Sequence, residues 1–162
     1  MNSAPSARHP FSPRRTIFFG ALTVGTVDIL WAFIWSAVSG HGPIYVFQSV
    51  AGGLLGSDTY DGGLPTALLG MFCHYFIATC VVTTYYLASR RLTALARQPW
   101  LFGPLYGIAV YGVMYGIVLP LSAYHTSGIH FNLAFVKGIT IHIFGIGLLT
   151  ALFARRGSAQ PA

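Results

Sequence analysis

The sequence has very little charge and is especially poor in acidic residues. Only 7% of its 162 residues are charged, only three are acidic, and none is glutamate. Soluble domains have about a quarter charged residues, so the composition excludes an ordinary soluble domain. Cysteine is also scarce. Cys73 and Cys80 lie seven positions apart in one apolar run, which on a helix is ~10 Å along the axis and too far for a mutual disulfide.

The sequence also lacks the short motifs that identify common enzymes. It contains no P-loop, no dinucleotide fingerprint, no Gly-x-Ser-x-Gly and no His-Glu-x-x-His. Three acidic residues leave almost no scope for paired-carboxylate or phosphate–magnesium chemistry. His41, His125 and His130 fall in predicted loops near Asp58 and Asp61, but their spacing matches no metal-binding signature. We therefore expect a protein that is not an enzyme.

Long apolar runs are what the sequence does contain. There are four, at residues 16–38, 64–88, 100–121 and 133–154, and each has 22 to 25 residues. About 20 apolar residues suffice for a transmembrane helix. The runs do not alternate in polarity, which excludes a membrane β-barrel. The sequence predicts an all-α, polytopic membrane protein: one domain over residues 1–162, built as a four-transmembrane-helix bundle.

Basic residues set the expected orientation of this bundle. Eight of the nine lie on one side of a four-span arrangement, and the ninth, Lys137, lies at the opposite end, where it can extend outward. The eight are Arg8, Arg14, Arg15, Arg90, Arg91, Arg97, Arg155 and Arg156. The positive-inside rule places both termini and the 89–99 loop in the cytoplasm. The net charge of +6 then reflects the orientation of the protein in the membrane. We therefore expect no nucleic-acid partner.

Two segments near the first span admit alternatives. The small residues at 37–39 could end a cleaved signal peptide, but the run before them is long and carries Asp28 in its middle. The first outer loop contains helical apolar spacing over residues 43–56, with Pro43 suited to a first helical position and Gly56 to a stop. Fourteen residues are too few to span. We expect an interfacial or re-entrant helix, either a lid or a segment on the membrane surface.

Glycine patterns indicate how the spans pack. The third run carries Gly103, Gly107, Gly112 and Gly116, which form two Gly-x-x-x-Gly pairs on nearly opposite faces of a regular helix. Each pair would allow close helix packing, within a compact bundle or with one face in a homodimer. The second and fourth runs share Gly-x-x-x-His-x-Phe, which suggests a duplicated two-span unit with His74 and His142 facing each other.

Three polar residues stand at similar depth within the apolar runs. Asp28 lies near the middle of the first run, on a face with small residues, and a carboxylate there costs about 2.5–3.5 kcal/mol. His74 and His142 occupy small-residue faces of the second and fourth runs. We expect the three side chains to point into the bundle. Each could instead simply hydrogen-bond a tyrosine, serine or carbonyl of a neighbouring helix.

Three functional roles fit such a buried polar cluster. An aspartate beside histidines can relay protons. Two histidines from facing helices can ligate the iron of a b-type haem. Two histidines and an aspartate can bind a divalent metal. The sequence does not decide among these roles, and it identifies no specific metal.

Several segments together resemble a known group of proteins. They are Gly25-Thr26-Val27-Asp28, residues 43–56, Gly70-x-x-x-His74 and Leu119-Pro120-Leu121-Ser122. This pattern resembles small proteobacterial inner-membrane proteins and, more distantly, the YagU-like membrane proteins, a family loosely linked to acid resistance. The resemblance implies a bacterial inner membrane and no particular mechanism.

The resulting expectation is a non-enzymatic inner-membrane protein. It would be an accessory partner of a larger membrane complex, or an envelope or acid-stress protein. The alternatives are a small transporter or proton-conducting protein that uses Asp28, His74 and His142, and an electron carrier with haem b between the two histidines. The lipid bilayer is the expected partner in every case, with a larger complex or a homodimer as a further one.

Overall fold

The structure, a computed structural model, describes residues 12–125 and 128–158, which contain helices and no strand. Four helices are long and apolar enough to cross a membrane: α1 (Pro13–Val38), α3 (Gly63–Arg91), a third span over Pro99–Leu121 and a fourth over Leu133–Gly157. The all-α prediction is thereby confirmed, and each of the four predicted runs forms a helix long and apolar enough to cross a membrane. Each predicted boundary lies within three residues of the helix end.

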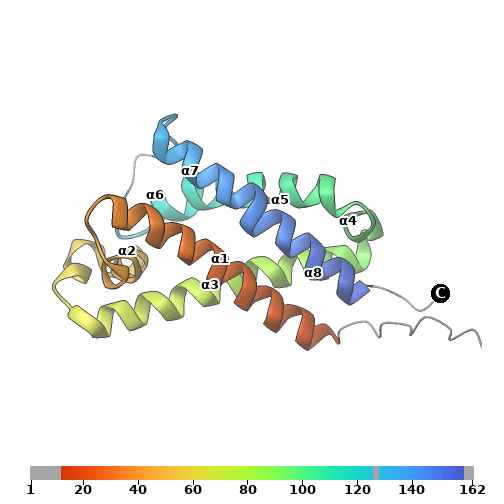
Figure 1. Ribbon diagram of the computed structural model, residues 1–162, viewed down its shortest axis with the longest axis horizontal. Helices are drawn as coiled ribbons and strands as arrows, with labels where there is room; N and C mark the ends of the chain where they lie inside the picture. Colours follow the sequence, from red (N-terminus) through yellow and green to blue (C-terminus); the bar gives the residue numbers. More distant parts are fainter. Residues whose placement is uncertain (1–11, 126–127, 159–162) are drawn as a thin grey trace, which may run out of the picture.

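The spans run antiparallel, and their ends differ in chemistry. α1 begins, α3 ends and α8 (Leu149–Ser158) ends at the same side of Figure 1, where α4 (Thr93–Arg97) also lies. We call this side the arginine end because it carries Arg14, Arg15, Arg90, Arg91, Arg97, Arg155 and Arg156. Arg8 lies outside the described residues. The opposite side, the loop end, holds α2 (Pro43–Leu55) and α6 (Leu119–Leu121).

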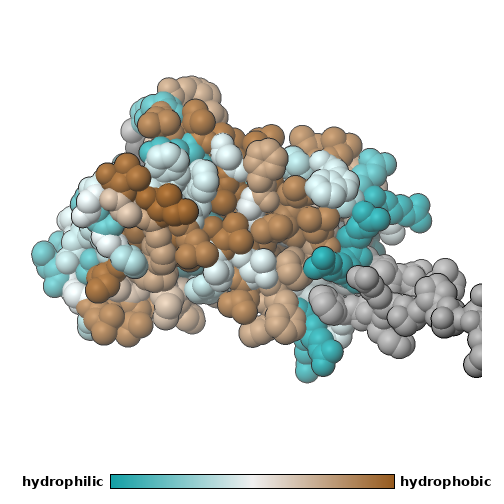
Figure 2. Space-filling model, in the orientation of Figure 1, coloured by the Kyte–Doolittle hydropathy of each residue, from teal (hydrophilic) through white to brown (hydrophobic). Residues whose placement is uncertain are grey.

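The exterior of the bundle is apolar, as a lipid-facing surface would be. Figure 2 shows hydrophobic residues across the middle of the molecule, with the hydrophilic ones gathered toward its two ends. Large side chains such as Phe72, Phe76 and Ile34 are more than half exposed. Water would penalise such a surface, whereas hydrocarbon would not.

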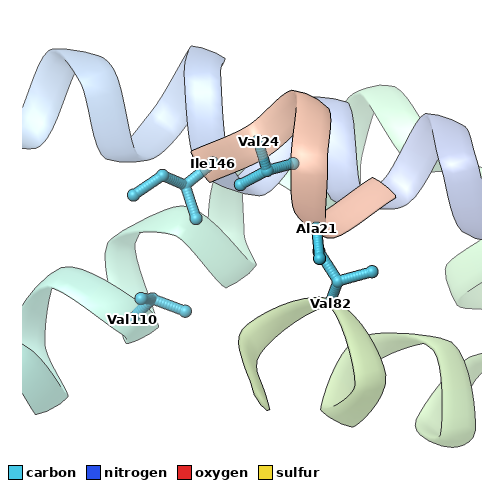
Figure 3. Packing of buried hydrophobic residues seen from close by; sticks show 5 residues of the cluster. All are labelled: Ala21, Val24, Val82, Val110 and Ile146. Carbon is cyan, nitrogen blue, oxygen red and sulfur yellow. The ribbon is translucent and has the colours of Figure 1, made fainter. Parts of the chain in front are cut away.

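A small apolar layer holds the four spans together. Ala21 and Val24 of α1 meet residues from each of the other spans (Figure 3). We call this set the core layer; its members are Ala21, Val24, Val82, Val110 and Ile146. All are at least nine-tenths buried. Because each span contributes at least one residue, this layer joins all four spans in the interior of the bundle.

The third and fourth spans are not regular α-helices. α5 (Pro99–Val113) continues through a π-helical segment, Met114–Val118, into α6. α7 (Leu133–Ile141) continues through a second π-helical segment, His142–Leu148, into α8. Pro120 accounts for the first, because it has no N–H to donate to the preceding turn. π-Helical turns gather at functional sites, and neither was predicted from sequence.

Residues 43–56 form the predicted helix. α2 begins at Pro43, and Gly56 caps its end with a positive φ of 67°. In Figure 1, α2 is seen almost end-on while the four spans run across the picture, so its axis crosses theirs. It packs on α3 at Gly70, where any side chain would overlap the carbonyl of Phe47. Gln48 fastens it further by donating to the carbonyl of Gly63 at 3.1 Å. α2 is therefore a docked helix and not a free loop.

The contact at Gly70 makes a testable prediction. A Gly70→Ala variant should lose the docking of α2, because its Cβ meets backbone that cannot rotate away. We expect destabilisation of about 1–3 kcal/mol, the usual cost of overpacking, measured by thermal unfolding in detergent. Gly53→Ala is the matched control, since its nearest neighbour, Ser122 Cβ, is 3.9 Å away. Equal stability of the two variants would contradict this packing role.

Only one of the two glycine pairs of the third span makes a close contact. A side chain at Gly103 or Gly107 would strike the backbone of the fourth span, and Gly147 returns the contact from the other side. Gly112 and Gly116 have no atom within 4 Å of a Cβ built on them. The second close-packing face is therefore absent within the described chain, and its use in a homodimer stays a prediction.

Candidate functional site

Each of the four spans contributes one titratable side chain to a single region of the bundle. Asp28 of α1 interacts electrostatically with His142 of the fourth span and His74 of α3. Tyr115, in the first π-helical segment, also interacts with Asp28. We call these four residues the polar cluster. The structure thus brings the three residues predicted from sequence together and adds Tyr115, which the sequence offered only as one of several tyrosine partners.

Glycines draw α1 close to its neighbours on both sides of Asp28. A side chain at Gly25 would come within 2.9 Å of the Tyr75 ring on α3. On the other flank, a Cβ at Gly145 would lie 3.2 Å from Cγ1 of Val27. Gly25 and Gly145 thus allow α1 to pass close to α3 on one side and to the fourth span on the other. Asp28 lies on α1 at this level, between the two neighbouring helices.

His74 is held by α1. Its Nε2 lies 2.8 Å from the carbonyl oxygen of Gly25. A carbonyl can only accept, so Nε2 carries the hydrogen and Nδ1 is the nitrogen that can take up a proton. The ring is 8% exposed and stands edge-on to Tyr75, with centroids 5.2 Å apart. The histidine is therefore fixed in orientation while one nitrogen stays available.

His142 is held by its own helix. Its Nδ1 donates to the carbonyl of Gly138, one turn earlier, at 2.8 Å, which leaves Nε2 to take up a proton. Tyr111 stands perpendicular to the ring at 5.2 Å, and Tyr115 packs at 6.1 Å. His74 and His142 thus have different supports, so the sequence similarity of their spans does not extend to equivalent roles.

The members of the cluster interact through charge and not through direct ligation. Across residues 12–125 and 128–158, no hydrogen bond or ion pair joins the Asp28 carboxylate to either ring. In the same part of the chain, no group of three or more His, Cys, Asp or Glu side chains is placed to hold a metal ion. This finding covers His41 and His125 as well as the cluster. Charge coupling makes the protonation of each group depend on its neighbours, but it is not itself a path along which a proton moves.

The cluster is closed toward the arginine end. On three spans, the core-layer residue is nearer the arginine end than the cluster residue of the same span. These pairs are Val24 and Asp28, Val82 and His74, and Ile146 and His142. These side chains are almost fully buried. The layer is defined by its apolar members, and Tyr106, whose hydroxyl donates to the carbonyl of Val81, packs against it.

The cluster is far less enclosed toward the loop end. The last buried residue of α1 is Ile29, the last of the third span is Tyr111, and the first of the fourth span is Ile141. Neither the Met114–Val118 segment nor α6 contains a buried residue. Asp28 itself is only half-buried. The three spans therefore pack loosely from the level of Asp28 outward.

Lys137 and two tryptophans lie between the cluster and the loop end. Trp31 donates from Nε1 to the carbonyl of Lys137 at 3.2 Å. The ammonium of Lys137 sits 3.7 Å from the centre of the Trp35 ring, a cation–π contact. Lys137 thus packs on α1 while its ammonium points from the level of Trp31 toward Trp35, nearer the loop end. Sequence reasoning missed this contact because it joins residues about a hundred positions apart.

A row of aromatic residues links α2 to the second outer loop. His41 stacks on Tyr45 at 4.0 Å, and Tyr45 stacks on Tyr60 at 4.8 Å. The hydroxyls of Tyr60 and Tyr124 lie 2.9 Å apart. Burial raises the pKa of the Tyr60 hydroxyl, and the hydrogen bond with Tyr124 raises it further. The Tyr60 hydroxyl therefore stays uncharged at neutral pH, and the row serves as a contact between loops.

The fold and this site define a class: a bundle of four helices long and apolar enough to span a membrane, with an aspartate and two histidines in its interior. Comparisons with protein-family models, with curated proteins and with solved structures find no match to the chain.

Proposed function

We propose that this chain is a non-enzymatic, proton-responsive protein of the bacterial inner membrane. Protons from the loop-end side would be taken up by the polar cluster, and the loosely packed outer halves of the spans would respond. The observation that carries the proposal is the convergence of Asp28, His74 and His142 at one depth. It favours the acid-stress role over a purely accessory one, for which the fold contains no comparable feature.

The membrane setting of the proposal rests on two features. The apolar exterior suits a multi-pass protein, and the arginines gathered at one end favour cytoplasmic termini by the positive-inside rule. The loop end would then face outward, and α2, whose axis crosses the spans, would lie at the outer membrane surface. The resemblance to small proteobacterial inner-membrane proteins and to the YagU-like family supports the same setting and the link to acid.

The polar cluster supports proton uptake through its charges. Each histidine keeps one ring nitrogen with no hydrogen bond in the described chain, so each can accept a proton without breaking its backbone contact. Asp28 stabilises the imidazolium that forms. Histidine changes charge between about pH 5 and pH 8, which is the range an acid-responsive protein would use.

The other two roles of the cluster fit the structure less well. Haem ligation through Nε2 would require His74 to give up its bond to Gly25. Proton conduction across the membrane would require a path past the buried apolar side chains of the core layer. Binding of protons from one side requires neither change.

The proposal can be tested with tryptophan fluorescence. Trp31 and Trp35 lie one and two turns from Asp28 on α1, so they report on its surroundings. The full chain in lipid nanodiscs should show a fluorescence transition between about pH 5 and 8. An Asp28→Asn variant should lose this transition or move it by about one pH unit or more, because the carboxylate no longer stabilises a histidine cation.

Asp58→Asn is the matched control. Asp58 lies in the first outer loop, where Ser57 donates to its Oδ1 at 3.4 Å and both residues are exposed. This variant removes the same charge outside the spans and should keep the wild-type transition. An unchanged transition in Asp28→Asn would contradict the proposal. Steady proton flux through liposomes that Asp28→Asn abolishes would replace it with proton conduction.

A further inference from the structure

A shallow apolar groove lies at the arginine end, well away from the polar cluster. It occupies about 260 Å³ where the end of α3, α4 and the start of α5 meet. Its lining is almost wholly apolar and comprises Thr84, Tyr85, Ala88, Leu95, Phe102, Leu105 and Tyr106. The space is small for a drug-sized molecule, but it suits a segment of a hydrocarbon chain.

Hydrogen bonds fix the shape of the groove. The Tyr85 hydroxyl donates to the carbonyl of Leu95 at 2.9 Å and so ties α4 to α3. The Tyr106 hydroxyl donates to the carbonyl of Val81 at 2.8 Å and so ties α5 to α3. The two rings lie 4.9 Å apart. Because both hydroxyls already have backbone partners, the groove presents ring faces and aliphatic carbon to whatever occupies it.

Positive charge borders one end of the groove. Thr84 and Ala88 line it, and Arg91 follows Ala88 by three positions, so the three share one stripe of α3. Leu95 lines it from α4, which ends at Arg97. Arg91 and Arg97 are exposed. An occupant would therefore meet an apolar surface along the spans and cationic side chains at their ends.

We propose that this groove binds an anionic phospholipid, with an acyl chain along Ala88, Leu105 and Tyr106 and the headgroup phosphate beside Arg91. Apolar and anionic parts joined in this order are the chemistry of such a lipid, and cationic side chains at the membrane surface attract anionic headgroups. Trp100, which is 67% exposed at the start of α5, suits the headgroup level. The proposal is independent of the proton-responsive function.

Native mass spectrometry of the full chain in detergent tests this site. The probes are phosphatidylglycerol and phosphatidylcholine with identical acyl chains. We expect one saturable site for phosphatidylglycerol, with an affinity at least about fivefold higher than for phosphatidylcholine. This ratio is the contribution expected from one arginine at the membrane surface. Arg91→Gln should remove this preference, and Arg91→Lys should keep most of it.

Two further variants separate the groove from the general basic surface. Leu105→Trp should fill the groove and weaken both lipids, and because Leu105 is 51% exposed the change should leave the fold intact. Arg14→Gln removes an equal charge from α1, which contributes no residue to the groove. Equal affinity for the two lipids, or an equal loss in Arg14→Gln and Arg91→Gln, would overturn the proposal.

Discussion

A Gly107→Ala variant is expected to lose about 2 kcal/mol or more of stability, a cost at the upper part of the range for overpacked sites. The added methyl group would overlap the carbonyl of His142 and come within 2.9 Å of the Ile143 Cα atom. Both are backbone atoms of a packed span, so neither can move by changing a rotamer. The spans would have to separate where Gly103, Gly107 and Gly147 bring them together. Reversible unfolding in mixed micelles measures the loss.

Gly112→Ala is a matched control on the same helix. Like Gly107→Ala, this change replaces glycine by alanine, whose intrinsic helix propensity is more favourable by about 1 kcal/mol. The added Cβ of residue 112 would have no neighbouring atom within 4 Å. We expect it to be neutral or slightly stabilising. If both variants lose the same stability, the close approach of the two spans is not the cause. Since Gly107 rests on the His142 backbone, only the Gly107 variant should also disturb the pH-dependent fluorescence.

The spans could be predicted from sequence because their signal is local. Length and apolar composition are sufficient to recognise a helix that can cross hydrocarbon, and Pro43 and Gly56 mark the ends of α2 by their own backbone preferences. The docking of α2 could not be predicted in this way. It depends on the fit of Gly70 against the Phe47 carbonyl, and nothing in either segment alone specifies the other.

The polar cluster was predictable in part. A charged residue in an apolar span must face the bundle, so Asp28 and the two histidines could be expected to converge. The helical periodicity that places them assumes a regular helix, however. The π-helical segments at Met114–Val118 and His142–Leu148 depart from this periodicity, and Tyr115, which interacts with Asp28, lies in the first of them. Pro120 was the one local signal for the first of these irregularities.

The coupling between Asp28 and the histidines can be tested by combining Asp28→Asn with a histidine variant. Asp28 interacts more strongly with His142 than with His74. Asp28→Asn alone removes the carboxyl group that interacts with the His142 ring, so the position or amplitude of the fluorescence transition should change. His142→Gln alone removes the group that takes up the proton, while its amide can still donate to the Gly138 carbonyl.

If the two residues act as one unit, their effects will not add. In the His142→Gln background the transition should be absent, and adding Asp28→Asn should leave the fluorescence unchanged at every pH. The Asp28→Asn change combined with His125→Gln, in the exposed second outer loop, should instead show simple addition. Additive behaviour for Asp28 and His142 would mean that the two titrate independently, and the cluster would then be a set of separate structural contacts.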